Sequence, residues 1–313
     1  MTHRERNRMA SDNPATEPAP IDRMVQIRTD PQSLALHVRE WPGDRQPFVL
    51  VHGLASNART WDQVAARLAA DGHRVIAVDQ RGHGLADKPD DGYDFATVAE
   101  DLRLLMDELS VDAPILAGQS WGGNVALVFG AVYPERAAGL AFVDGGFIDM
   151  QMRPNAAWEQ VAVDLRPPSL LGIPRVDIAA RMRHFHPEWD EAGLEGALAN
   201  FETLADGTIR PWLTLARHMT ILRALWEQRP GVFYPLVQAP VVIAAAADHR
   251  NPEWMAIKAA QVAAAAEALP RASVHWFEET DHDIHMHRPA ALVDLFRHEL
   301  AHGIWSPQPA PAP

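Results

Sequence analysis

Short apolar runs alternate with segments of helical spacing along most of this chain. Runs of this length that are rich in Val and Ile predict buried strands, and apolar residues recurring every three or four positions predict amphipathic helices. The strands expected are residues 25–29, 34–41, 48–52, 74–79, 113–117, 139–144, 239–246 and 272–277. The helices expected between and after them are residues 60–70, 95–109, 124–133, 253–268 and 289–302. This alternation predicts an α/β fold in which an eight-stranded, mostly parallel sheet is flanked by helices.

The pattern changes between residues 150 and 234, where no strand-like run appears. Helical spacing predicts helices there near residues 155–165, 176–185, 190–204 and 213–228. We therefore expect a helical cap at 150–234, inserted into a core made of residues 23–149 and 235–304. Residues 1–22 and 305–313 are rich in Pro, Ala and polar residues, and we expect a disordered leader and a disordered tail there.

The composition excludes several classes of function. The formal net charge is −13 and no block of Lys or Arg occurs, which argues against nucleic acid as a partner. The absence of cysteine excludes disulfides and Cys-ligated metals. Residues 1–20 lack the apolar segment of a secretory signal, and no apolar run is long enough to cross a membrane. We expect a cytoplasmic protein that binds no membrane, and the composition leaves its oligomeric state open.

The chemistry of the chain centres on the segment from Gly118 to Gly122, which contains Ser120. It has the form G-x-S-x-G and lies between a predicted strand and a predicted helix, which is the context of a nucleophile elbow. In such a turn the serine adopts a sparsely allowed backbone conformation, so the residues two positions away on each side must be small. The turn also directs the N-terminus of the following helix toward any oxyanion that develops beside the serine.

Four motifs together give the chain a resemblance to the α/β-hydrolase superfamily over residues 24–303. They are Val51-His-Gly-Leu54, Asp79-Gln-Arg-Gly-His-Gly84, the elbow, and Asp281-His-Asp-Ile-His-Met-His-Arg-Pro289. The resemblance implies the fold and serine-dependent hydrolysis, but the family is chemically diverse, so it says little about the substrate.

The resemblance also implies a base and an acid for Ser120. The base of the family follows the last strand and precedes a Pro that begins the final helix, which is the position of His282; His285 and His287 on the same segment are rivals. The acid follows either the strand after the cap or the strand before it. We expect Asp248 to be this acid, with Asp144 as the alternative.

The residues around the reacting carbonyl follow from the same resemblance. The oxyanion hole is expected from the backbone N–H groups of Leu54 and Trp121. His52 and Gly53 adjoin it and are expected among the substrate-binding residues, with His52 acting as a structural hydrogen-bonding residue and not in catalysis. Arg81 and His83 are expected to hold the nearby loop by hydrogen bonds. From the cap, the residues expected to contact substrate in an apolar pocket are Trp158, Trp212 and Met219.

No metal and no cofactor are expected. The pairs His184/His186 and His285/His287 have alternating spacing, but they belong to separate segments. No G-x-G-x-x-G motif follows an early strand, and no phosphate-binding loop motif occurs.

The sequence thus predicts a carboxylic ester hydrolase acting on an ester or lactone, which includes large-ring lactones such as macrolides. A Ser at the elbow disfavours the dehalogenase and epoxide-hydrolase chemistry of relatives that carry a carboxylate there. Two alternatives stay open. One is a carbon–carbon bond hydrolase, which needs a cation for a substrate carboxylate, with Arg181, Arg183 or Arg217 as candidates. The other is a small-molecule receptor that retains the three catalytic residue types.

Overall fold

A computed structural model describes residues 19–28 and 33–306. The predicted leader lies largely outside the described residues, but its last two, Ile21 and Asp22, begin the first strand. Most of the predicted tail also lies outside the described residues. Trp305, its first residue, is buried, and its indole N–H donates to the carbonyl oxygen of Pro240 at 3.1 Å. The tail prediction is therefore wrong for Trp305, because this large apolar side chain packs into the core.

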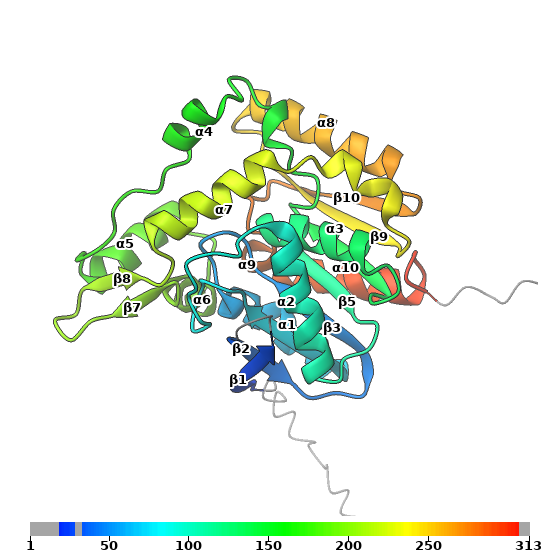
Figure 1. The fold of residues 1–313 in the computed structure, drawn as a ribbon, viewed down its shortest axis with the longest axis horizontal. Helices are drawn as coiled ribbons and strands as arrows, with labels where there is room; N and C mark the ends of the chain where they lie inside the picture. The colour runs from blue at the N-terminus through cyan, green and yellow to red at the C-terminus, as the bar shows by residue number, and fades with distance from the viewer. Residues whose placement is uncertain (1–18, 29–32, 307–313) are drawn as a thin grey trace, which may run out of the picture.

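The predicted eight-stranded, mostly parallel sheet is confirmed, and it forms the middle layer of the molecule (Figure 1). Its strands lie in the order β1-β2-β4-β3-β5-β6-β9-β10. Their bounds are β1 Ile21–Arg28, β2 Ser33–Trp41, β3 Arg45–Val51, β4 His73–Asp79, β5 Ile115–Gln119, β6 Gly139–Val143, β9 Val241–Ala247 and β10 Ala272–Glu278. Strand β2 pairs antiparallel with β1 and β4, and the remaining pairs are parallel. The carboxyl ends of the central strands therefore meet at one edge, where ligand sites of such sheets lie.

Helices cover both faces of the sheet, so alternate strand residues enter two separate hydrophobic clusters. The helices of the core that cover the sheet are α1 Asp62–Ala70, α2 Phe95–Glu108, α3 Trp121–Val132, α8 Pro252–Ala268, α9 Ile284–His287 and α10 Pro289–Ala301. Val49 and Val51 pack on the side of α2 and α3, whereas Phe48 and Leu50 pack on the side of α1 and α10. This division follows from the two-residue period of a strand.

The segment between β6 and β9 forms the cap, defined here as residues 150–236. It contains α4 Trp158–Asp164, α5 Arg175–Phe185, α6 Glu191–Leu198, α7 Leu215–Glu227, strands β7 Phe201–Thr203 and β8 Ile209–Pro211, and the short 3-10 helices η2 Met150–Met152, η3 Pro230–Val232 and η4 Tyr234–Leu236. The expectation that residues 190–204 are one helix and that the cap has no strand is wrong. Helix α6 ends at Leu198, and β7 and β8 form an antiparallel hairpin. Its turn contains Gly207 at φ +81°, a conformation that glycine adopts without strain.

Direct hydrogen bonds join the cap to the core. The side-chain amide of Asn57, just before the 3-10 helix η1 (Ala58–Trp61), donates to the carbonyl oxygen of Gly196 at 2.9 Å and to Oδ1 of Asn200 at 2.6 Å. On another side, the guanidinium of Arg217 donates to the carbonyl oxygens of Lys88 and Pro89 at 2.7 and 2.9 Å. The cap is thus hydrogen-bonded to two separate loops of the core.

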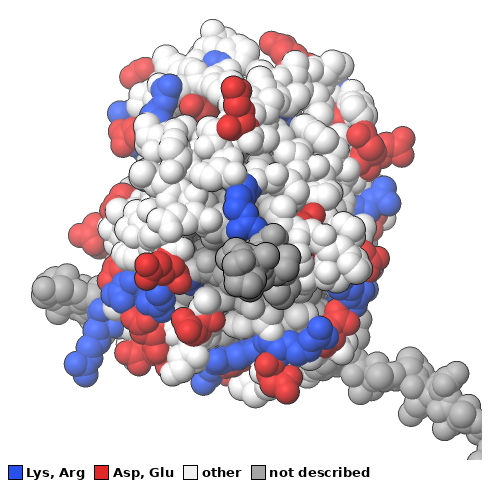
Figure 2. All heavy atoms as spheres, turned by 90° about the vertical axis from the view of Figure 1, so that its right-hand side faces the viewer, with Lys and Arg blue, Asp and Glu red and all other residues white. Residues whose placement is uncertain are grey.

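The surface carries charges of both signs. On the face drawn in Figure 2, acidic and basic side chains are interspersed, and a broad area between them is uncharged. Among the described helices, none is both long and apolar enough to span a bilayer.

Candidate active site

Ser120 lies in a tight turn between the end of β5 and the start of α3. Its backbone has φ +53° and ψ −122°, an unfavourable conformation for a residue with a side chain. A Cβ atom at Gly118 would lie 2.1 Å from the carbonyl oxygen of Gly122, and one at Gly145 would lie 2.2 Å from that of Ser120. The backbone N–H of Ser120 also donates to the carbonyl oxygen of Val143 at 3.0 Å. Close backbone packing on both sides therefore holds the strained turn.

Two backbone N–H groups lie where the sequence places an oxyanion hole. Trp121 begins α3, and Leu54 follows β3; both residues line the same cavity as Ser120. Neither N–H has a hydrogen-bond acceptor within the described part of the chain. These groups are thus available to an oxygen atom bound beside Ser120.

His52 lies behind the Leu54 loop and is fully buried. Its Nδ1 lies 2.7 Å from the carbonyl oxygen of Gly53, and its Nε2 accepts a hydrogen bond from the backbone N–H of Gln80 at 3.1 Å. Burial lowers the pKa of His52, so the ring is neutral. Neither His52 nor Gly53 lines either of the two cavities described below, and the hydrogen bonds of His52 support the loop.

The Nδ1 of His282 lies 2.6 Å from Oδ2 of Asp144. Asp144 directly follows β6 and is buried, and its Oδ1 accepts a hydrogen bond from the backbone N–H of Ala246 at 2.9 Å. The His282 side chain exposes 51% of its surface, toward the cavity that also contains Ser120. The Nε2 of His282 therefore remains for a proton exchanged in that cavity.

The structure corrects the expectation that Asp248 is the partner of His282. Asp248 follows β9, but both of its carboxylate oxygens bind the guanidinium of Arg250, at 2.7 to 3.0 Å. Its Oδ1 also accepts the backbone N–H of Arg250 at 3.0 Å. This local pairing occupies the carboxylate of Asp248, and the alternative, Asp144, contacts His282 instead.

A buried lysine shares the carboxylate of Asp144. The Nζ of Lys258 donates to Oδ2 of Asp144 at 2.7 Å and to the carbonyl oxygen of Ala246 at 2.9 Å. Only 8% of the Lys258 side chain is exposed, and the residue lines the cavity beside His282. The ammonium group and the imidazole thus contact the same oxygen atom.

These contacts determine the protonation of the pair. Burial raises the pKa of Asp144, but the hydrogen bonds and charges of His282 and Lys258 outweigh burial, so its pKa lies below the usual value. Burial lowers the pKa of His282, and the hydrogen bond and charge of Asp144 outweigh that effect, so its pKa is raised. Asp144 is therefore ionised, and His282 is a base strong enough to accept a proton.

The two rival histidines of the same segment lie elsewhere. His285 is buried against Trp61, with ring centroids 4.6 Å apart, and burial lowers its pKa to about 3. The Nδ1 of His287 accepts a hydrogen bond from the backbone N–H of Asp281 at 3.3 Å. Neither lines the cavity of Ser120, so His282 is the histidine of this segment that shares that cavity.

Ser120 and His282 lie in a cavity of about 430 Å³, here called the first cavity. Its wall is mostly apolar and includes Leu54, Phe147, Ile148, Met150, Leu165, Leu222, Leu225 and Met255. Its cations are Lys258, paired with Asp144, and Arg153. The Arg153 guanidinium lies 5.2 Å from the ring centroid of Trp254 and makes no ion pair with a carboxylate of the described chain.

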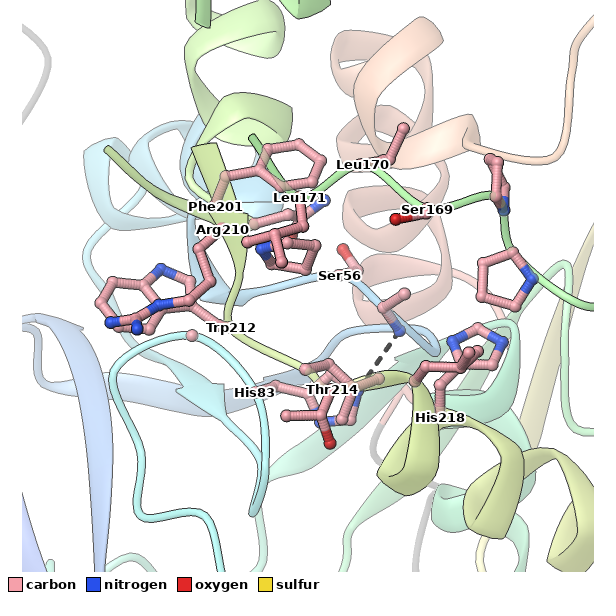
Figure 3. Close-up of a pocket in the computed structure, with 18 residues that line it drawn as sticks. Ser56, His83, Ser169, Leu170, Leu171, Phe201, Arg210, Trp212, Thr214 and His218 are labelled. Atoms are coloured by element: carbon pink, nitrogen blue, oxygen red, sulfur yellow. Dashed lines mark hydrogen bonds between the residues drawn. The ribbon is translucent and has the colours of Figure 1, made fainter. Parts of the chain in front are cut away.

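A second cavity of about 480 Å³ adjoins the first (Figure 3). Cap residues 167–171 and 210–215 form most of its wall, and Ala55, Ser56 and His83 close it from the core. His218 lines both cavities and therefore marks their junction. In Figure 3, His83 lies at the floor, where its Nε2 accepts the backbone N–H of Ala55 at 3.3 Å.

The cap residues expected to contact substrate divide into two groups. Trp212 lines the second cavity. Trp158 packs on Trp226 with ring centroids 5.9 Å apart, and Met219 packs against the main hydrophobic cluster; neither lines a cavity. The structure thus corrects the expectation for Trp158 and Met219, which belong to the packing of the cap.

Arg81 holds its loop as expected: its Nη2 donates to Oδ1 of the buried Asp101 at 2.6 Å. The three arginines expected to bind a substrate carboxylate line neither cavity. Of these, Arg183 pairs with Glu191, and Arg217 pairs with Asp90.

One cluster in the described chain has metal-ligand chemistry: His186, Glu188 and Asp281. Their ligand atoms lie within 4.8 Å of one another, and His186 already pairs with both carboxylates, at 3.2 and 3.4 Å. The ion pairs of His186 with Glu188 and Asp281 account for the approach of these three side chains.

The sequence analysis missed Lys258, Arg153 and His218. A signal existed for Lys258, because it shares one face of α8 with the buried residues Gln261, Val262 and Ala265, and a lysine on a buried face needs a partner. Arg153 and His218 follow no motif, and only the folded cap brings them to the cavities.

Comparison with known proteins gives a consistent result. A family model described as "alpha/beta hydrolase fold" matches residues 46–172. The 2-(acetamidomethylene)succinate hydrolase of Mesorhizobium japonicum is 35% identical over 123 residues, 39% of this chain and 44% of that protein. A putative non-heme chloroperoxidase of Synechocystis sp. is 40% identical over 95 residues, 30% of this chain and 34% of that protein. The matched regions thus span less than half of these two relatives.

The similarity in structure extends further than the similarity in sequence. The crystal structure of E-2-(acetamidomethylene)succinate hydrolase has a TM-score of 0.76 and 26% sequence identity to this chain. The match covers 89% of this chain and 98% of that structure.

Proposed function

We propose, from the premise that this chain belongs to the α/β-hydrolase superfamily, that it is a serine hydrolase cleaving a carboxylic ester or lactone through an acyl-enzyme. The observation that carries the proposal is the contact between His282 and Asp144, at 2.6 Å, in the cavity that contains Ser120. A buried carboxylate on Nδ1 fixes the tautomer whose Nε2 is a free base.

The residues would act in two steps. The hydroxyl of Ser120 attacks the carbonyl carbon while Nε2 of His282 takes its proton, and the N–H groups of Leu54 and Trp121 bind the oxyanion. His282 then donates that proton to the leaving alcohol. In the second step His282 takes a proton from water while the water oxygen attacks the acyl carbon. The bond from that carbon to Ser120 then breaks, the acid leaves, and His282 returns the proton to the oxygen of Ser120.

The two adjoining cavities support a bulky substrate with a large apolar part. The scissile carbonyl would lie in the first cavity, near Ser120, and an apolar substituent would extend past His218 into the second cavity, beside Trp212. Large-ring lactones fit this description as well as simple esters do, because both use the same chemistry.

Arg153 favours a second candidate, a hydrolase whose substrate carries a carboxylate. Three cations line the two cavities: Lys258 pairs with Asp144, Arg210 pairs with Glu202, and Arg153 alone has no carboxylate partner in the described chain. The other anion of the first cavity, Asp248, is occupied by Arg250. The bond cleaved would then be an ester, or the carbon–carbon bond of a keto acid. The name of the Mesorhizobium relative, which acts on a substituted succinate, agrees with an acidic substrate.

The proposal is tested with a fluorophosphonate probe and with p-nitrophenyl acetate and butyrate. We expect one probe molecule per chain and multiple turnovers of ester, both abolished in Ser120→Ala. Labelling that persists in that variant would exclude Ser120 as the nucleophile, and a single burst without turnover would favour the receptor function.

The two candidate substrate classes are separated by Arg153→Gln. Mono-p-nitrophenyl succinate and p-nitrophenyl butyrate have similar size and differ by one carboxylate. Loss of a hydrogen bond to a charged group costs about 1.5–3 kcal/mol, so kcat/KM should fall roughly 10- to 100-fold for the succinate alone. If Arg153→Gln changed kcat/KM equally for both esters, Arg153 would not bind the substrate carboxylate, and the apolar substrate would be the better candidate.

A further inference from the structure

The ammonium group of Lys258 lies in the polar centre of the site. It occupies the second turn of α8, and its Nζ donates to Oδ2 of Asp144 at 2.7 Å. The same oxygen lies 2.6 Å from Nδ1 of His282, so one carboxylate oxygen serves a lysine and a histidine together. A relay of serine, histidine and aspartate requires only the histidine there.

The contacts of Lys258 fix Asp144 in place. Asp144 has φ +43°, which is unfavourable for an aspartate and leaves its carboxylate dependent on surrounding donors. The backbone N–H of Ala246 donates a hydrogen bond to Oδ1 of Asp144. The carbonyl oxygen of Ala246 accepts a hydrogen bond from Nζ of Lys258. The carboxylate of Asp144 is therefore tied to Ala246 of β9 both directly and through Lys258.

The charge of Lys258 also acts on His282. When His282 accepts a proton, the negative charge of Asp144 stabilises the imidazolium. A positive charge on the same oxygen, 2.7 Å away, cancels part of that stabilisation. His282 is consequently a weaker base than it would be beside Asp144 alone, and it stays neutral to lower pH.

We propose that Lys258 is a positioning residue of this site, which holds Asp144 in its strained conformation and weakens the proton affinity of His282. The inference rests on the proposed function, because it assigns Lys258 a role only through Asp144 and His282. Its consequence is that His282 becomes protonated at a lower pH than it would without the charge of Lys258.

Besides Asp144 and Lys258, the ionisable residues Arg153, His218 and Asp248 line the cavity of His282 from other elements, and the remaining ones are on its own segment. Asp283 is half-buried and accepts a hydrogen bond from Nε2 of Gln119 at 3.2 Å; its partial burial raises its pKa. Asp281 pairs with His186, and His285 is held neutral by burial. Lys258 is thus the cation of a separate helix that acts on the Asp144–His282 pair.

The test compares the imidazole pKa of His282 in four proteins by NMR titration of labelled histidine, with the resonance assigned through His282→Gln. In Lys258→Met we expect the pKa to rise by about one unit, the scale of a nearby charge. Lys258→Arg should keep the wild-type value, because the adjoining cavity leaves room for a guanidinium. Arg136→Met is the matched control, since it removes a cation that pairs with Asp107 outside both cavities.

An unchanged His282 pKa in Lys258→Met would overturn the inference, even if the variant lost activity or stability. If Lys258→Met does not fold, Lys258→Gln keeps a hydrogen-bond donor for Asp144 without the charge, and it should shift the pKa in the same direction. Because the titration needs no substrate, it distinguishes this inference from the proposed function. Where the wild-type protein turns over an ester, the acidic limb of kcat/KM should move to higher pH by the same amount.

Discussion

The Nδ1 of His37 lies 2.8 Å from Oδ2 of Asp79, and the two residues face each other across the antiparallel pair of β2 and β4. The carboxylate of Asp79 also accepts the backbone N–H groups of Ala58 at 2.7 Å and of Leu85 at 2.9 Å. The buried carboxylate of Asp79 thus joins the end of β4 to β2, to η1 and to the loop that follows β4.

The first prediction concerns acid stability. Burial raises the pKa of Asp79, but the hydrogen bonds and nearby histidines outweigh it and lower the pKa from 3.8 to about 2. A carboxylate whose pKa is lower in the folded than in the unfolded protein stabilises the fold at pH values above its unfolded-state pKa. This stabilisation is lost as the pH falls through its folded-state pKa. We expect the free energy of unfolding to decrease by about 2 kcal/mol more in wild type than in Asp79→Asn between pH 5 and pH 2.

Urea unfolding at several pH values measures this difference. Burial lowers the pKa of His37, but the hydrogen bonds and charges of Asp79 and Asp22 outweigh burial and raise it. The contribution of His37 to the free energy of unfolding is therefore present below pH 6.5 and lost as the pH rises through its folded-state pKa. Parallel curves for both proteins from pH 5 to pH 2 would contradict the assignment to Asp79.

The second prediction separates the two aspartates. Asp144→Asn preserves the shape of the acid but supports the wrong tautomer of His282, so kcat should fall about 10⁴-fold, as in the serine proteases. Asp248→Asn is the matched control, because it removes a carboxylate that binds Arg250 at the rim. Steady-state kinetics of both variants, with circular dichroism as a check of folding, measure the ranking. A severe loss in Asp248→Asn together with a mild one in Asp144→Asn would contradict the structure.

The third prediction concerns the packing behind Ser120. In Gly145→Ala the new Cβ would lie 2.2 Å from the carbonyl oxygen of Ser120, so the turn must shift and the serine must move. We expect labelling by a fluorophosphonate to slow by at least about 100-fold, the cost of displacing a reacting group by about 1 Å. Gly231→Ala meets no atom within 4 Å and should label at the wild-type rate. Equal rates would show that the turn tolerates the methyl group.

The fourth prediction separates cavity lining from cap packing. Trp212 lines the second cavity, with Nζ of Lys88 5.0 Å from its ring centroid, whereas Trp158 packs on Trp226. Trp212→Ala should change the ratio of kcat/KM between a bulky and a small ester. The expected change corresponds to about 1–3 kcal/mol, the free energy by which apolar pockets discriminate between substrates. Trp158→Ala should leave that ratio unchanged and lower the melting temperature. A shift of the ratio in both variants would mean that the cap acts as one unit.

The sequence predicted the sheet well because the period of the apolar residues reports which face of each element is buried. It missed the hairpin of β7 and β8, since three-residue strands are too short to show that period. The dipeptide Asp206-Gly207 was the available signal for a tight turn.

The acid could not be chosen from sequence, since Asp144 and Asp248 both directly follow a strand of the sheet. What decides between them is local. Arg250 lies close enough in the chain to bind both oxygens of Asp248, whereas Asp144 meets His282 and Lys258 only in the folded protein. Such tertiary pairing has no periodic signature.

The position of Asp144 in the chain has a consequence for how this protein can diversify. Because the acid comes before the cap, the turn after β9 carries no residue of the proton relay, and yet Asp248 and Asn251 of that turn line the first cavity. Insertions or substitutions in that turn would alter which substrates bind, while the reacting groups keep their geometry. Directed libraries confined to residues 248–251 should therefore yield new selectivities at a high proportion of folded, active clones.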